Sequence, residues 1–226
     1  MGVLVGYLDT ILVPFSLLLT VGYHAYLWYT FKTKPSRTTI NVGIESHRRT
    51  WFSDIKKLGD GKKGMLAVQS LRNSQMVIIL TASIAIIFNI SLAALTNNAY
   101  NASHVFNLEL FGSISGATFA LKFGSASVLL LSSFMCSSMA VAYLIDAVFL
   151  INASVEFTYA GHTKKVLETG NTLALIGNRL LCIAFPMVLW MFGPVPVAVS
   201  SVALVWWFYE LDFAAKITDF QKKRPI

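Results

Sequence analysis

Long apolar stretches without a charged side chain divide this sequence into segments of membrane-spanning length. Asp, Glu, Lys and Arg are absent from 10–31, 73–108, 123–145 and 180–209, runs of 22, 36, 23 and 30 residues. A helix needs about 20 apolar residues to cross the hydrocarbon core, and backbone amides in lipid must pair within their own segment. The alternation typical of a β-barrel is not seen. The pattern therefore predicts an all-α, polytopic integral membrane protein.

Five transmembrane helices are expected. The sequence Gly193-Pro194-Val195-Pro196 interrupts the last apolar run and predicts a tight reversal between two antiparallel helices. The third helix would be about 60 Å long at the helical rise, so we expect its later half to project from the bilayer. The predicted spans, all in one membrane domain of residues 1–226, are about 3–31, 65–95, 111–151, 173–192 and 194–213.

The distribution of positive charge predicts the orientation. Ten Lys and Arg residues lie in 32–72, two in 152–172 and four in 214–226, whereas 96–110 has none. The positive-inside rule therefore places the loop 32–64 and the tail 214–226 in the cytoplasm. The amino end is then outside, and an odd number of spans brings the carboxyl end inside.

Composition agrees with a membrane location and excludes several classes of protein. Of the 226 residues 55% are hydrophobic and 13% charged, which is too apolar for an ordinary soluble enzyme. Both cysteines fall in predicted spans, so no disulfide framework is expected. No cleavable leader precedes the first span. We expect the plasma membrane, with the endoplasmic reticulum as the alternative, and no nucleic-acid partner, because the net charge of +7 belongs to the membrane surface.

Arg179 is the clearest ionisable residue inside a predicted span, where a charge costs about 2.5–3.5 kcal/mol. It lies 14 residues before Gly193, and Glu210 lies 16 residues after Pro194, so the two have similar depths in an antiparallel pair. An ion pair of Arg179 with Glu210 or Asp212 is therefore predicted near the cytoplasmic face. It serves either as a structural clasp or as a gate.

Two further ionisable residues are candidate pore or gating groups. Lys122 lies two to three turns inside the third helix, and Asp9 and Glu109 are its candidate partners. It either extends to the outer headgroups or contributes to a positive ring in an oligomer. His24 lies toward the cytoplasmic end of the first helix, as an interfacial hydrogen-bonding residue or a proton sensor.

The third helix also carries small residues at every fourth position. They are Gly112, Gly116, Ala120 and Gly124. Small residues at this spacing let helix backbones approach closely in lipid, where packing must supply the attraction. The stripe predicts close packing, either within the chain or between copies in a homo-oligomer.

The first cytoplasmic loop combines basic and aromatic residues. Ile44, Trp51, Phe52, Ile55 and Leu58 fall roughly on one helical face, which predicts a short helix lying in the membrane interface. Such a helix would place basic side chains against anionic lipids, and topology alone also accounts for much of this charge. The candidate lipid contacts are Arg48, Arg49, Lys56 and Lys57.

Several short segments together resemble a known family. They are Leu12-Val13-Pro14, Gly22-Tyr23-His24, the run from Leu66 to Ser74, Gly177-Asn178-Arg179 and Phe192-Gly193-Pro194. The chain resembles the plant and bacterial membrane family called domain of unknown function 599, in its plant branch. The resemblance extends over nearly the whole chain. It implies a multi-pass membrane protein, with no activity to carry over.

No catalytic constellation, metal motif or cofactor motif is found, so we expect neither an enzyme nor a bound cofactor. The sequence favours an oligomeric membrane channel or transporter-like protein for a small ion or solute. The alternative is a membrane scaffold or adaptor whose basic cytoplasmic surface binds anionic lipid or a soluble partner.

Overall fold

The computed structural model describes residues 2–33, 61–105, 116–152 and 160–213, and side chains in all but the outermost residues of these ranges. Within them the chain forms α1 (Gly2–Thr33), α3 (Gly61–Val105), α4 (Gly116–Asn152), α5 (Ala160–Leu189) and α6 (Pro194–Phe213), with a 3₁₀ turn at Trp190–Phe192. All five α-helices contain a segment long and apolar enough to cross a membrane. The predicted all-α fold with five spans is confirmed.

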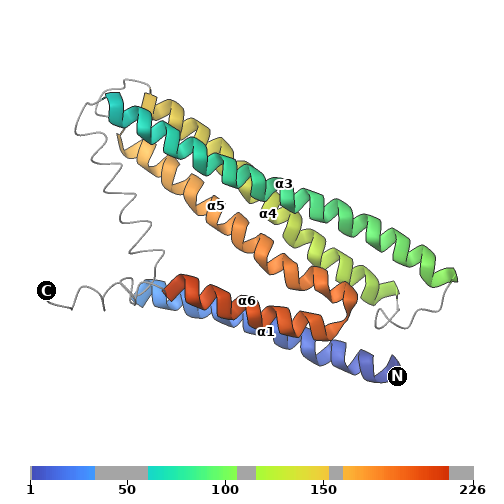
Figure 1. Ribbon diagram of the computed structural model, residues 1–226. Helices are drawn as coiled ribbons and strands as arrows, with labels where there is room; N and C mark the ends of the chain where they lie inside the picture. Colours follow the sequence, from blue (N-terminus) through green and yellow to red (C-terminus); the bar gives the residue numbers. More distant parts are fainter. Residues whose placement is uncertain (1, 34–60, 106–115, 153–159, 214–226) are drawn as a thin grey trace, which may run out of the picture.

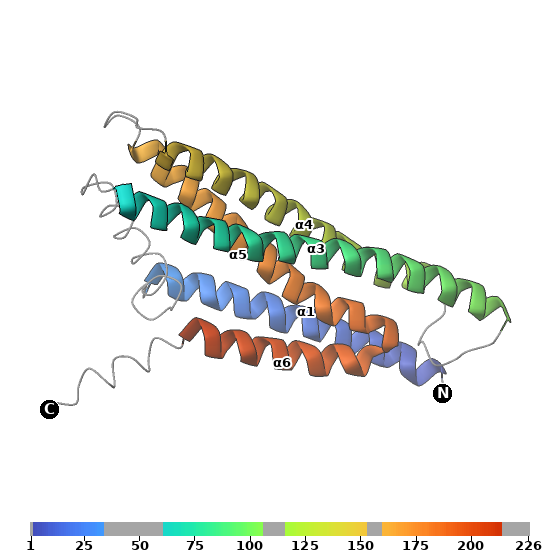
Figure 2. The same cartoon turned by 45° about the horizontal axis from the view of Figure 1, so that its top comes forward.

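The helices form two groups. The long helices α3, α4 and α5 pack together, α4 most extensively on α5, while α1 packs mainly on α6 (Figure 1). A 45° rotation shows the same grouping (Figure 2). We call these groups the three-helix group and the α1–α6 pair.

The described helices cross the bundle five times, so the start of α1 and the end of α6 lie at opposite ends of the bundle (Figure 1). We call the end that holds the α5–α6 connection the turn end. At the other end α1, α4 and α6 finish and α3 and α5 begin. We call it the basic end, because the connections and tail that leave it hold most of the Lys and Arg residues.

The α5–α6 connection is as tight as the sequence predicts. Gly193 has φ of +123° and its N–H donates to the Trp190 carbonyl oxygen at 3.1 Å. Glycine tolerates this backbone conformation because it has no Cβ, and proline is favoured at the first helical position that follows.

Two apolar clusters form the interior. The first, toward the turn end, takes residues from every helix, including Val13, Leu92, Leu130, Met187 and Val197. The second lies toward the basic end and comes from the three-helix group alone, including Leu71, Leu144 and Leu167. Apolar side chains such as Leu18, Ile90, Val199 and Trp206 are exposed, as expected of a surface solvated by lipid.

Several helix boundaries differ from those expected. The structure begins α5 at Ala160 rather than near 173, and extends α3 over Gly61–Val105 rather than 65–95. The sequence boundaries mark where charge enters the chain, whereas a helix continues past the hydrocarbon wherever neighbouring helices support it. The 20 residues of α6 match the hydrocarbon thickness at about 1.5 Å per residue, so α3, α4 and α5 are all longer than one crossing requires.

Candidate functional site: two buried ionic clusters

The buried face of α1 is unexpectedly polar. Its buried positions include Asp9, Ser16, Thr20 and Tyr23, which recur at intervals of seven, four and three residues. This spacing places them along one side of the helix. The hydroxyl groups of Ser16 and Thr20 donate to carbonyl oxygens one turn earlier, at 2.8 and 3.0 Å. The charged and phenolic residues instead contact other helices.

The first contact joins Asp9 to the three-helix group near the turn end. Asp9 Oδ2 lies 3.5 Å from Nζ of Lys122 on α4, and the two side chains are only 8% and 2% exposed. Asp9 Oδ1 accepts a hydrogen bond of 3.1 Å from the indole N–H of Trp190. The ammonium group also lies 5.7 Å from the centre of the Trp190 ring, within cation–π range. We call these three residues the Lys122 cluster.

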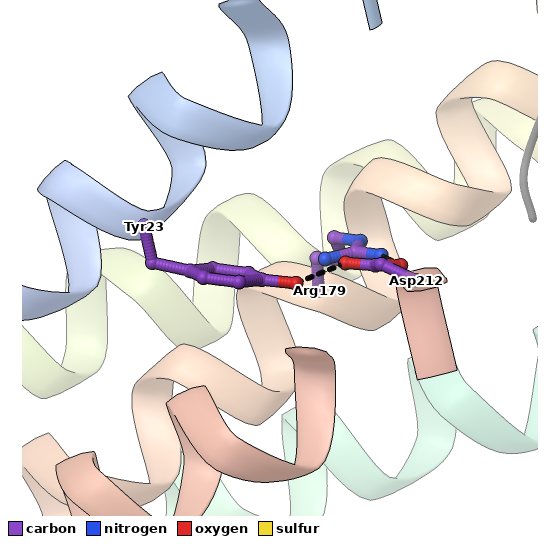
Figure 3. Close-up of polar contacts among 3 residues, drawn as sticks. All are labelled: Tyr23, Arg179 and Asp212. Carbon is purple, nitrogen blue, oxygen red and sulfur yellow. Dashed lines mark hydrogen bonds and ion pairs between the residues drawn. The ribbon is translucent and has the colours of Figure 1, made fainter. Parts of the chain in front are cut away.

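The second contact lies near the basic end and joins three helices (Figure 3). Arg179 of α5 forms a charged hydrogen bond with Oδ1 of Asp212 on α6. The hydroxyl group of Tyr23 on α1 donates to Oδ2 of the same carboxylate at 2.5 Å. A carboxylate with a charged partner and a hydroxyl donor is well satisfied in an apolar setting. We call these three residues the Arg179 cluster.

Aromatic rings surround the Arg179 cluster. The guanidinium carbon of Arg179 lies 4.7 Å from the centre of the Phe208 ring. Phe208 stacks on Tyr23 and meets the His24 ring edge to face, with centroids 6.2 and 5.8 Å apart. His24 Nδ1 contacts the Thr20 carbonyl oxygen at 2.8 Å, which assigns the ring proton to Nδ1.

The structure brings together some of the residues singled out from the sequence. Arg179 pairs with Asp212, whereas Glu210 is exposed on another side of α6. Lys122 pairs with Asp9 within one copy, with both side chains almost completely buried. His24 lies beside the Arg179 cluster rather than in a separate site.

The stripe of small residues does not make a close contact within the described part of the chain. Ala120 is exposed, and a Cβ added at Gly124 would meet no atom within 4 Å. Close approach occurs instead between α4 and α5, where a Cβ at Gly177 would lie 2.5 Å from Ser137 Oγ. Ser133 Oγ donates to the Gly177 carbonyl oxygen at 2.7 Å at this contact. The intrachain contact predicted for Ala120 and Gly124 is therefore wrong.

Other candidate residues fall where side chains are not described. These are Gly112, Gly116, Glu109 and the predicted lipid contacts Arg48, Arg49, Lys56 and Lys57, together with the predicted interfacial helix. Among the described residues, no group of three or more His, Cys, Asp and Glu side chains is arranged to hold a metal ion.

Sequence reasoning missed Tyr23 and Trp190 as members of the two clusters, and Phe208 as the ring that lies against Arg179. The seven-residue spacing of Asp9, Ser16 and Tyr23 was the available signal, because polar residues that share one face of an apolar helix point to a buried polar contact. Depth along a helix gave Glu210 and Asp212 as candidate partners of Arg179 on the neighbouring helix. It could not show which side of α1 faces the other helices.

Comparison with known proteins places the chain in a family. No curated protein matches it, and no solved structure does. The model of one family, described as protein of unknown function DUF599, matches residues 11–217. Because the match covers most of the chain, this five-helix membrane protein belongs to the DUF599 family.

Proposed function

We propose that the protein transports a small ion or solute between the α1–α6 pair and the three-helix group, with the two ionic clusters as gates. The observation that carries the proposal is the position of the clusters. Asp9 and Tyr23 lie 14 residues apart on α1, about 21 Å at the helical rise. Each joins the α1–α6 pair to the three-helix group near a different end of the bundle.

Buried polar side chains lie between the two clusters in depth. Ser16 and Thr20 of α1 lie between Asp9 and Tyr23. Ser201 of α6 lies seven residues after Pro194 and 11 before Asp212, and its buried hydroxyl group makes no hydrogen bond to the described residues. Polar groups inside a membrane bundle mark substrate paths in many transporters. We call these three residues the polar seam.

The grouping of helices supports a rocking motion. The α1–α6 pair is connected to the three-helix group through the turn at Gly193 and the packing of α5 on α6. The two ionic clusters and the apolar cluster that includes Val13 make further contacts between the two groups. Breaking one cluster while the other holds would open the polar seam to one side at a time. Alternating access by rigid-body rocking around a central site works in this way.

Orientation and assembly are part of the proposal. The basic end faces the cytoplasm, because the connections that leave it carry most of the Lys and Arg residues. The protein works as a transporter rather than as an enzyme, in the plasma membrane. The predicted homo-oligomer stays a prediction, which mass photometry of nanodiscs would measure.

Accessibility of the polar seam tests the gates without knowledge of the substrate. Ser201→Cys is made with Cys136 and Cys182 replaced by Ala, and a membrane-impermeant thiol reagent is applied to one side of oriented vesicles. We expect Asp212→Asn to speed labelling from the basic end only, and the neutral pair Asp9→Asn with Lys122→Met to speed it from the turn end only. An ion pair worth about 1.4 kcal/mol gives an increase of about tenfold.

The matched control is Ser83→Cys on α3, since Ser83 is outside both clusters and its hydroxyl group bonds its own helix at Ile79. Its labelling should not respond to either gate variant. If Ser201→Cys labels at the same rate in all backgrounds, the clusters are clasps and the transport proposal fails.

One observation favours a scaffold as the second candidate. The helix ends that adjoin the basic segments gather at one end of the bundle (Figure 1). Replacing Arg48, Arg49, Lys56 and Lys57 by Gln should then reduce the phosphatidylserine that copurifies in native nanodiscs, while seam labelling stays unchanged. Unchanged lipid content would reject this candidate.

A further inference from the structure

The guanidinium group of Arg179 has unused hydrogen-bonding capacity. Its Nη2 donates to Asp212, while Nη1 is buried and makes no hydrogen bond within the described structure. A guanidinium group can bind a carboxylate through two parallel N–H donors. Arg179 therefore has an N–H donor group, Nη1, that Asp212 does not use. A second planar acceptor group could bind there. The side chain as a whole is 15% exposed, but Nη1 itself is buried, so a ligand reaches Nη1 only when the cluster opens.

The carboxylate of Asp212 is fully engaged, in contrast. Oδ1 accepts from Arg179 and Oδ2 accepts from Tyr23, and the side chain is 3% exposed. An anion that reached Nη1 would place two carboxylates around one guanidinium group. Two like charges in a poorly solvated site are unstable unless one of them takes a proton.

The rings beside Arg179 would favour an anion with an apolar body. Phe208 covers the guanidinium face at 4.7 Å, and Tyr23 and His24 both pack on Phe208. Phe208 and Tyr23 are themselves buried, at 5% and 7% exposure, so a carboxylate that reaches Nη1 enters an apolar setting in which its own apolar body is favoured. A fully hydrated inorganic anion would gain little from these rings.

We propose that the Arg179 cluster binds a small organic carboxylate together with one proton, the carboxylate at Arg179 and the proton on Asp212. The substrate class rests on the proposed transport function, whereas the binding itself does not. The charges balance: Arg179 keeps its positive charge, the ligand carboxylate at Nη1 brings one negative charge, and one O–H bond forms on Asp212, which becomes neutral. Solvent supplies the proton.

Other titratable groups near the cluster are few. Tyr23 donates to Asp212, and His24 lies against Phe208 with its buried Nε2 making no hydrogen bond. Cys182 lies three residues after Arg179, about one turn along α5. Glu210, two residues from Asp212, is exposed. His24 is therefore the alternative proton acceptor, and the test separates it from Asp212.

Calorimetry of benzoate binding to the full chain tests the proposal, with nanodiscs of phosphatidylcholine alone and neutral benzamide as the ligand control. Titration in buffers of different ionisation enthalpy counts the protons taken up. We expect about one proton per benzoate, and an affinity that falls about tenfold for each unit of rising pH. Benzamide should not bind. Absence of benzoate binding, or binding without a proton, would overturn the proposal.

Asp212→Asn gives the sharpest contrast. The variant keeps the side-chain shape but removes the competing charge, so benzoate should bind at least about tenfold tighter at neutral pH, without proton uptake. A purely structural ion pair predicts weaker binding in this variant. Glu210→Gln is the matched control on the same helix and should leave affinity and proton count unchanged. Continued proton uptake in Asp212→Asn, abolished by adding His24→Gln, would overturn the assignment to Asp212.

Tyr23→Phe tests the same point with a smaller structural change, in case Asp212→Asn fails to fold. Loss of the hydroxyl donor makes Asp212 easier to protonate, so benzoate should bind about two- to tenfold tighter, with the proton still taken up. Weaker binding would contradict the proposal. Adding phosphatidylserine to the nanodiscs distinguishes a lipid headgroup from a soluble carboxylate, because a headgroup ligand would compete with benzoate. Such competition would overturn the soluble class.

Binding and transport fail separately in these tests. Benzoate binding with an unreactive Ser201→Cys would reject the gates and leave the carboxylate site intact. If the gate variants speed the labelling of Ser201→Cys but benzoate does not bind, the gates stand and the substrate class is rejected.

Discussion

The two ionic clusters solve the same physical problem in different ways. In the Lys122 cluster a compact ammonium group meets one carboxylate, which the Trp190 indole N–H also contacts, and both charges are almost completely buried. In the Arg179 cluster a planar guanidinium group uses part of its donor set, and its side chain is several times more exposed than that of Lys122. The first cluster is enclosed at the turn end, and the second has spare donors near the basic end.

The difference indicates different roles. Leaving the buried ammonium group without its carboxylate would carry a large free-energy cost, so the Lys122 cluster should open rarely. A guanidinium group can exchange one planar acceptor for another and remain satisfied, so the Arg179 cluster suits a site where partners change. The predictions below measure this contrast, beginning with the largest effect.

Lys122→Met should be the most damaging single substitution. It leaves Asp9 charged and buried with the indole N–H as its remaining partner in the cluster, and breaking a buried pair in this way costs about 3–5 kcal/mol. The free energy of unfolding, measured by steric trapping in bicelles, should fall by this amount. The double variant Asp9→Asn with Lys122→Met should recover most of the loss. Equal losses in the single and double variants would show that the ion pair is not the cause.

Arg179→Met should cost less, about 2–3 kcal/mol, because Asp212 keeps the Tyr23 hydroxyl donor and lies near the end of α6. The same steric-trapping measurement gives the difference between the two clusters directly. A loss equal to that of Lys122→Met would remove the distinction between an enclosed cluster and an exchangeable one.

Gly177→Ala should disturb the Arg179 cluster through the contact between α5 and α4. Its new Cβ would lie 2.5 Å from Ser137 Oγ and 3.2 Å from the Ser133 carbonyl oxygen, so α5 must move from α4 two residues before Arg179. Overpacking of this kind costs about 1–2 kcal/mol of unfolding free energy. Gly124→Ala is the matched control, because its Cβ meets nothing within 4 Å. It should be neutral or slightly stabilising through helix propensity.

Much of the fold followed from the spacing of charges. Runs without charge gave the five helices, and Gly193-Pro194 gave the tight turn. The start of α5 was placed 13 residues late because apolar runs report the lipid boundary rather than the end of helical hydrogen bonding.

The site was less predictable for a geometric reason. Counting residues from a turn gives depth, which was enough to nominate Glu210 and Asp212 as partners of Arg179, and the structure pairs Arg179 with Asp212. It gives no rotation about the helix axis, so the part played by Tyr23 and Trp190 depended on packing. The stripe at Ala120 and Gly124 was misplaced for the same reason, the missing rotation about the helix axis. Residues four apart are rotated by about 40° from one another around that axis, so a row at this spacing does not stay on one face. The buried face of α4 instead alternates steps of four and three through Ala126, Leu130, Ser133, Ser137 and Ala140.

The smallest expected effect separates the two clusters most cleanly, because it removes one hydrogen bond from each. Trp190→Phe deletes the indole N–H that contacts Asp9 at 3.1 Å, and Tyr23→Phe deletes the hydroxyl group on Asp212. Each should lower the free energy of unfolding by about 1 kcal/mol, measured by steric trapping. A larger loss in Tyr23→Phe than in Trp190→Phe would mean that Asp212 is held more firmly than Asp9, and that the Arg179 cluster does not exchange its partner.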